Sequence, residues 1–344
     1  MTALPSLAQP RTIELEQVGE RAVPAEGLID LMPDGRVLVL TDDHRILREI
    51  APGGGQFDEV GRIADGIISS FGASFFTVSP DGSYLAFGDN NFGSGRVYVT
   101  LTSLLTAPGR ELPLLGIDIE NFAADWKSTT ELAVSYGDPV TGFGEVAIIT
   151  IGFPLTKAVV LEGIGGASGG VGFDSSGNLF GGNGFDFVPG VGSSTGDVRG
   201  FSAHLVQAVL DGARGPINFE DEGFAIADRL SAGGLNFDPS GNLFIGGGDL
   251  FGGSGDYNYF AVLNGDAVAD IIAGRDTNPL RPADTFTDDP SALTGESLYS
   301  GWFDEPSGEW LMRSSDDPAT LFRYRVKRLI ADDAFISTGR TALP

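Results

Sequence analysis

The chain has 344 residues, of which 47 are acidic and 21 are basic, so its formal net charge is −26. It contains no Cys and only two His, which excludes disulfides, thiolate metal sites and iron–sulfur clusters and argues against a His-rich metal centre. The charge also excludes nucleic acid and anionic membranes as partners, because both would be repelled. Cations, neutral small molecules, glycans and basic proteins are compatible with it.

The apolar content is sufficient for a large core, since 42% of the residues are hydrophobic and 24 are Phe. The longest apolar run lies near Val146–Phe153 and is far shorter than the roughly 20 residues that a spanning helix needs, so no membrane span is predicted. An acidic, Lys-poor, Cys-free chain favours an extracellular or periplasmic protein in its mature form. We expect a monomer.

A strand–turn–strand pattern recurs along the chain. Its clearest copies run from Leu28 to Leu40 and from Phe75 to Phe87, each around a Pro-Asp-Gly turn. Further copies lie at 123–134, 171–180, 235–245 and 302–312, the first of them degenerate. The turn glycine of each clear copy supplies the positive φ that the turn requires. Six copies (spaced by 47 residues from Gly35 to Gly82 and by 67 from Gly241 to Gly308) predict propeller blades.

The remaining apolar runs complete these blades. Third strands are predicted at 96–101, 145–151, 259–263 and 321–326, and fourth strands at 58–63, 111–115, 157–161 and 223–227. Short helical turns are expected around 103–107 and 205–210. Thr12–Val18 is predicted to pair with the last blade and close the ring, which would leave no open edge. The segment 333–337 is the alternative for that position.

The predicted fold class is therefore all-β, a single six-bladed β-propeller with its N-terminal strand in the last blade. One domain spans residues 1–344. The blades are expected at about 22–66, 67–118, 119–164, 165–229, 230–292 and 293–330 plus 11–20.

Acidic and amide side chains follow the second strand of every blade, on one face of the ring. They are Asp42, Asp89, Asn90, Asp138, Asn183, Asp186, Asp249, Asp256 and Asp316, with His44 beside the first. Carboxylate and amide oxygens are the ligands that Ca²⁺ prefers. We expect Asp89, Asp138 and Asp249 to be metal ligands and the other residues to line a ligand-binding face. The alternative is that Asp, Asn and Gly are simply common in reversing loops.

The first blade carries a family resemblance. Ala25-Glu26-Gly27-Leu28, followed by the segment from Met32 to Arg48, resembles the first blade of the SMP-30/gluconolactonase-type six-bladed propellers. The Asp-Pro-Ser-Gly-Asn-Leu-Phe copies are similar to NHL-type propeller repeats. The resemblance implies a catalytic divalent metal over the channel, with Glu26 as its first ligand and Asn121 as a second. The loops leading into blades four and five, 167–171 and 231–235, lack the Asn and Asp that this ligand set would require.

Other motifs do not indicate chemistry. Gly166-Ala-Ser168-Gly-Gly170 fits the string of a nucleophile elbow, but nothing around it is helical. Trp126 and Trp302 occupy similar places in two hairpins and are expected to pack between blades. The sequence is therefore compatible with two functions. The first is a cation-bearing binding protein that takes a small molecule, a glycan or a protein on the loop face. The second is a Ca²⁺-dependent lactonase or esterase-like hydrolase.

Overall fold

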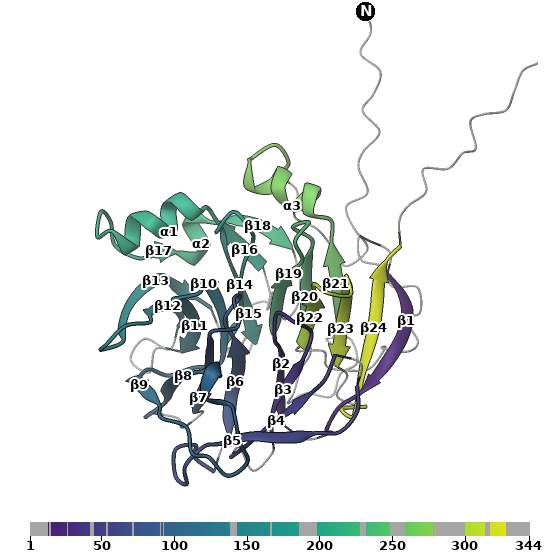
Figure 1. Cartoon of the computed structure of the whole chain (residues 1–344). Helices are drawn as coiled ribbons and strands as arrows, with labels where there is room; N and C mark the ends of the chain where they lie inside the picture. The colour runs from purple at the N-terminus through teal and green to yellow at the C-terminus, as the bar shows by residue number, and fades with distance from the viewer. Residues whose placement is uncertain are drawn as a thin grey trace, which may run out of the picture.

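The computed structural model describes most of the chain. The described residues are 13, 15–25, 27–41, 45–52, 54–70, 72–89, 91, 93–137, 143–165, 167–185, 198–227, 232–247, 259–277, 279, 300–313 and 317–327. Their strands form six sheets arranged around one axis, and the colours of Figure 1 run round the ring until the yellow strand β24 lies beside the purple strand β1. The predicted all-β, six-bladed propeller is confirmed.

Each sheet contains consecutive strands paired with their neighbours. The first three sheets are β2 (Leu28–Leu31), β3 (Val37–Leu40), β4 (Ile46–Ile50), β5 (Asp58–Arg62); β6 (Ala73–Val78), β7 (Tyr84–Asp89), β8 (Arg96–Leu101), β9 (Leu115–Asp118); and β10 (Ala123–Ser128), β11 (Glu131–Gly137), β12 (Gly144–Thr150), β13 (Thr156–Ile164). The next two are β14 (Ala167–Phe173), β15 (Leu179–Phe185), β16 (Val198–Phe201), β18 (Phe224–Ala227); and β19 (Gly234–Phe237), β20 (Leu243–Gly247), β21 (Tyr259–Leu263).

The sixth sheet closes the ring. It has the order β1 (Leu15–Ala22), β24 (Thr320–Val326), β23 (Glu309–Arg313) and β22 (Ser300–Asp304). Strand β1 is antiparallel to β24, with Leu15 opposite Val326 and Ala22 opposite Thr320. The N-terminal strand thus supplies the outer strand of the last blade, as the sequence predicts. The alternative segment 333–337 lies outside the described residues.

The turn chemistry follows the repeat. Gly35 and Gly82 adopt φ of +82° and +72°, the region that their hairpin turns need and that other residues rarely enter. The apolar side chains that flank these turns fill the spaces between neighbouring blades. Between blades five and six, for example, Phe244 packs against Trp310 and Met312, all of which are fully buried.

Three connections reach back to the preceding blade, and we call them straps. The first strap joins β8 to β9 and includes the 3₁₀ helix η1 (Thr102–Leu104). It hydrogen-bonds to the outer strand β5, where Arg62 N donates to Arg110 O at 2.8 Å and Leu112 N donates to Arg62 O at 2.9 Å. This pairing explains one error of the sequence analysis: residues 111–114 belong to the strap, and the fourth strand of blade two is β9, from Leu115 to Asp118.

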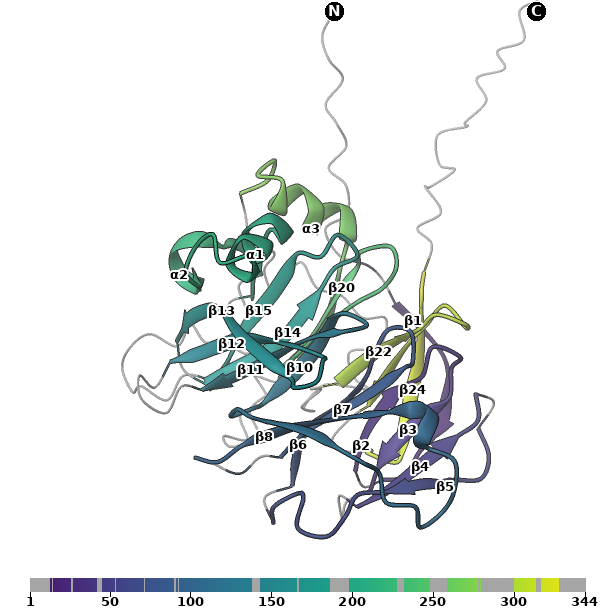
Figure 2. The ribbon, with the colours of Figure 1, turned by 60° about the vertical axis from the view of Figure 1, so that its left-hand side comes forward.

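The other two straps are helical and lie together on one side of the ring (Figure 2). The second contains α1 (Ala203–Leu210), β17 (Ile217–Asn218) and α2 (Phe219–Glu222), and β17 pairs in parallel with β13 of blade three. The third contains α3 (Gly265–Ile272), which lies against β18 of blade four. The sequence predicts η1 and α1 but not α2 and α3, whose caps are Asn218 and Asn264.

Among the described residues, no helix has both the length and the apolar character needed to cross a membrane.

Candidate functional site

The channel is enclosed by the first strand of each blade. These inner strands are β2, β6, β10, β14, β19 and β22, and each contacts the inner strands on both sides, so the ring is continuous. We call the mouth the end where inner strands begin and second strands finish. The predicted site residues belong to this end.

The structure describes Asp89, Asn121 and Asn183 among the predicted site residues. The others lie outside the described residues and stay predictions: Glu26, Asp42, His44, Asn90, Asp138, Asp186, Asp249, Asp256 and Asp316. Within the described part of the chain, no three His, Asp or Glu side chains are grouped so that they could hold a metal ion.

Asn121 and Asp89 lie together at the mouth, where blade two meets blade three. Asn121 is 2% exposed, and its amide group donates to Asp89 O at 3.1 Å and to Ile119 O at 3.0 Å. Its amide oxygen accepts the hydroxyl of Ser74. The Asp89 carboxylate accepts the N–H of Ser69 at 2.8 Å. Both side chains therefore join neighbouring strands and loops at the rim of the channel.

We expect Asn121→Ala to lower the free energy of unfolding by about 2 kcal/mol or more, because the mutation leaves two buried carbonyls and a hydroxyl without their donor or acceptor. Urea denaturation in the presence of a chelator measures this without any contribution from a metal. Glu120→Gln is the control, since the new amide oxygen can still accept the Gly95 N–H that Glu120 accepts at 3.1 Å. An unchanged urea midpoint for Asn121→Ala would show that the amide has no structural role.

Asn183 lies at the mouth between blades four and five, and its side chain differs from the other two. It is 7% exposed, and its Oδ1 atom is buried without a hydrogen-bond partner among the described residues. Its backbone oxygen accepts the N–H of Ala232 at 2.9 Å, which fixes the strand against the next blade. An unpaired buried carbonyl oxygen is unfavourable by about 1–3 kcal/mol. Such an atom calls for a donor or a cation.

The inner strands of blades two and four are bulged beside these residues. In β6 the register shifts between Ala73 and Phe76, and in β14 it shifts between Ser168 and Val171. Bulges disrupt the pairing locally and redirect side chains, and they are frequent beside binding sites. Here they lie directly opposite the ends of β7 and β15, which carry Asp89 and Asn183.

Inside the channel, polar side chains form a ring that the sequence analysis missed. Asp30 of β2 accepts the N–H of Val78 in β6 at 2.6 Å, and Asp125 of β10 accepts the N–H of Phe173 in β14 at 2.9 Å. Asn236 of β19 donates to Gly301 O in β22 at 2.5 Å. Every second inner strand is thus linked to the next one by a hydrogen bond between a side chain and the backbone. A charged residue within an otherwise apolar strand, as in Leu28-Ile-Asp30-Leu, is the signal that could have identified this ring.

Both carboxyl groups of the ring titrate far from their ordinary range. Burial raises the pKa of Asp30 to about 6, against the opposing effect of hydrogen bonds from Val78, Leu31, Thr77 and Trp302. Burial also raises the pKa of Asp125 to about 7, and the negative charge of Asp30 adds to this rise. Each side chain keeps some surface toward the channel, but the surrounding inner strands leave its charged form poorly hydrated.

Trp302 is part of the ring. Its side chain is half-buried and donates a hydrogen bond to Asp30, whereas Trp126 is buried in the core between blades two and three. Both Trp side chains pack between blades, as the sequence predicts, since Trp302 also packs against the apolar cluster shared by blades one and six.

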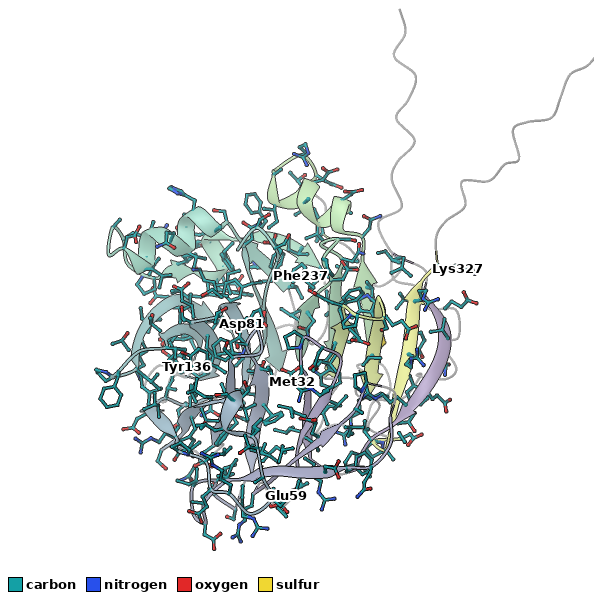
Figure 3. All side chains as sticks on the ribbon, in the orientation of Figure 1. Met32, Glu59, Asp81, Tyr136, Phe237 and Lys327 are labelled. Atoms are coloured by element: carbon teal, nitrogen blue, oxygen red, sulfur yellow. The ribbon has the colours of Figure 1, made fainter. Side chains whose placement is uncertain are left out.

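A cleft of about 500 Å³ lies away from the mouth, at the opposite ends of blades one and two. Met32 and Asp81, labelled in Figure 3, are on its wall together with Arg36, Glu49 and Leu101. Arg36 contacts Asp34 at 2.7 Å and Glu49 at 2.6 Å, and the Asp81 carboxylate accepts the hydroxyls of Ser79 at 2.9 Å and Ser83 at 2.7 Å. Because the charged groups of this cleft already have partners within it, the buried Oδ1 atom of Asn183 at the mouth is the stronger indication of a ligand.

No protein-family model matches this sequence, and no curated protein matches it significantly. Solved structures do resemble it. The PQQ-bound aldose sugar dehydrogenase of Streptomyces coelicolor is 12% identical, over 93% of this chain and 100% of that one, with a TM-score of 0.58. Regucalcin from Agrobacterium tumefaciens, described as a calcium-binding protein, is 12% identical, over 93% and 98% of the two chains, with a TM-score of 0.51.

A luciferin-regenerating enzyme is 10% identical, over 92% of this chain and 95% of that one, with a TM-score of 0.50. At such identities the likeness concerns the fold and not the activity. The chain is a six-bladed β-propeller, and its resemblance to the gluconolactonase and regucalcin type of propeller is confirmed at the level of the fold.

Proposed function

We propose that the protein binds Ca²⁺ at the mouth of its channel and holds a small neutral molecule there. The observation that carries this proposal is the Oδ1 atom of Asn183, which is buried and has no hydrogen-bond partner in the part of the chain that the structure describes. An amide oxygen is a hard donor of the kind Ca²⁺ prefers, and a bound cation would compensate this unpaired oxygen. Asp89 places a carboxylate at the same end of the ring.

The charge of the chain supports a cation and a neutral ligand over an anion. A net charge of −26 attracts cations to the surface and repels anionic substrates. The predicted ligands Glu26, Asp138 and Asp249 would add to the site, since their loops belong to the same face. An extracellular or periplasmic location is part of the proposal, because modules of the extracellular space bind Ca²⁺ at about 10⁻⁴ to 10⁻³ M. The fold likeness to a calcium-binding regucalcin agrees with it.

Calcium titration of the protein, after treatment with a chelator to remove bound metal, tests the proposal. We expect Ca²⁺ to raise the melting temperature of the wild type, and Asn183→Leu to weaken Ca²⁺ binding about tenfold or more, a loss of about 1.4 kcal/mol. Leu has nearly the same shape but no oxygen to offer. Asn178→Ala is the control, since Asn178 lies in the hairpin turn at the far end of the same blade, bonded to Asp174 at 2.7 Å.

Two results would contradict the proposal. One is a wild-type protein whose melting temperature does not respond to Ca²⁺. The other is an Asn183→Leu variant that binds Ca²⁺ as tightly as the wild type and the Asn178→Ala control do. Isothermal titration calorimetry separates a loss of affinity from a loss of stability.

The second candidate function is metal-dependent hydrolysis of a lactone or ester. It is favoured by the position of Asn121, which lies at the start of blade three at the mouth, where the family resemblance requires a ligand. The amide oxygen of Asn121 already accepts the Ser74 hydroxyl, and its second lone pair would have to serve a metal. A panel of lactones with Ca²⁺ and with a chelator decides between binding and hydrolysis. Calcium-dependent turnover that Glu26→Gln abolishes would establish the hydrolase, whereas no turnover would exclude it.

A further inference from the structure

We propose that Asp30 and Asp125 form a coupled pH-sensitive pair inside the channel, so that the ring of inner strands which they link is most stable when both carboxyls are protonated. This inference concerns the interior of the channel and does not depend on a metal or ligand at the mouth. Its basis is geometric. Each carboxyl connects its own inner strand to the next one through a backbone N–H.

The two links are equivalent in construction. Asp30 bonds to Val78 N in β6, which lies 48 residues further along the chain, and Asp125 bonds to Phe173 N in β14, also 48 residues further along. Asp30 additionally receives the N–H of its neighbour Leu31 at 2.8 Å. The third link, from Asn236 to Gly301 O, uses an amide that does not titrate. The channel thus contains two links that depend on pH and one that does not.

Among the described residues, this pair has no counter-ion. Asp30 is the charged residue that raises the pKa of Asp125, and no cation of the described part of the chain is among the causes that lower either pKa. The inner strands β6, β14 and β19 carry no titratable side chain among their residues. Lys127 of β10 pairs with Glu131 at 2.7 Å, and Asp304 of β22 accepts the Ser307 hydroxyl at 2.6 Å.

The sign of the pH dependence follows from the direction of the shifts. Both carboxyl groups have a higher pKa in the folded chain than the ordinary 3.8, so the folded state holds their protons more tightly than the unfolded state does. The contribution of the two carboxyls to stability is therefore greatest at low pH and is lost as the pH rises through about 6 for Asp30 and about 7 for Asp125. The window from pH 5.5 to 8 isolates the effect, since ordinary carboxylates do not titrate there and the chain has only two His.

Thermal unfolding at constant ionic strength tests the proposal. We expect the melting temperature of the wild type to be several degrees higher at pH 5.5 than at pH 8. Asp125→Asn should reduce this difference, and the double variant Asp30→Asn, Asp125→Asn should remove it. Asn236→Ala is the matched control: it breaks the third link, so it should lower the melting temperature equally at both pH values. His44→Gln and His204→Gln should leave the difference unchanged.

A titration of the side-chain carboxyl ¹³C signals of Asp provides a second readout that needs no variant to fold. Two Asp carboxyls of the wild type should titrate above pH 5.5, in two steps. In Asp30→Asn the apparent pKa of Asp125 should fall, because the neighbouring negative charge is gone. The proposal is wrong if no Asp carboxyl titrates above pH 5.5, if the wild type melts at the same temperature at both pH values, or if Asp30→Asn leaves the titration of Asp125 unchanged.

Discussion

We expect Gly169→Ala to lower the free energy of unfolding by about 3 kcal/mol or more. Gly169 lies in the bulge of β14, and a Cβ atom there would come within 3.0 Å of Ala232 O, Gly182 O and the carbonyl carbon of Asn183. These are backbone atoms of the same blade and of the next one, so they cannot move aside as a flexible side chain could. The substitution has to push blades four and five apart.

Gly165→Ala is the control for this prediction. A Cβ at Gly165, in the loop leading into the same blade, would meet nothing within 4 Å. We expect a change within about 0.5 kcal/mol, because the residue is unconstrained and Ala restricts the unfolded chain. Urea denaturation of both variants measures the difference. Equal midpoints for Gly169→Ala and Gly165→Ala would show that the junction of blades four and five is not closely packed.

Trp310→Ala is expected to cost about 3–5 kcal/mol. Trp310 is fully buried in the core between blades five and six, and its ring centroid lies 5.7 Å from that of Phe244 and 5.4 Å from that of Phe303. Its removal leaves a cavity where the ring of blades closes. A large fall in melting temperature should accompany the loss.

Trp310→Phe separates the contribution of packing from that of polarity. The indole Nε1 of Trp310 is buried and has no hydrogen-bond partner among the described residues, an arrangement that itself costs about 1–3 kcal/mol. Phe keeps most of the aromatic contact and removes this unpaired group, so the variant should lose far less stability than Trp310→Ala. Calorimetric unfolding compares the two. A loss as large for Phe as for Ala would mean that the shape of the indole, and not its buried area, holds the two blades together.

The sequence predicts the ring of blades because the repeat is local. A Gly with positive φ and two flanking apolar runs specify a hairpin wherever they occur, as at Gly35 and Gly82. The straps could not be predicted in this way. Residues 111–114 have the pattern of a strand, but Leu112 hydrogen-bonds to Arg62 in another blade. The local pattern did not distinguish residues 111–114 from residues 115–118 as the fourth strand, and only the tertiary pairing does.

The candidate site was predictable in position but not in detail. Asp and Asn after the second strands indicate the mouth, and the structure places Asp89, Asn121 and Asn183 there. Only the packing shows that Asn121 is engaged by its neighbours while an oxygen of Asn183 is not. Asp30 and Asp125 escaped notice because a single acidic residue in a strand indicates nothing until the inner strands are brought together around the channel.

The pairing of β1 with β24 has a consequence for how the protein is made. Leu15 leaves the ribosome long before Val326, which lies opposite it and emerges only after five blades have been synthesised. During this time β1 has no strand to pair with, and the first blade does not yet have the sixth blade to pack against. Closure is therefore a late, long-range step, and contacts of that kind slow folding. A nascent chain that stalls before β24 would expose both ends of an open ring to other chains.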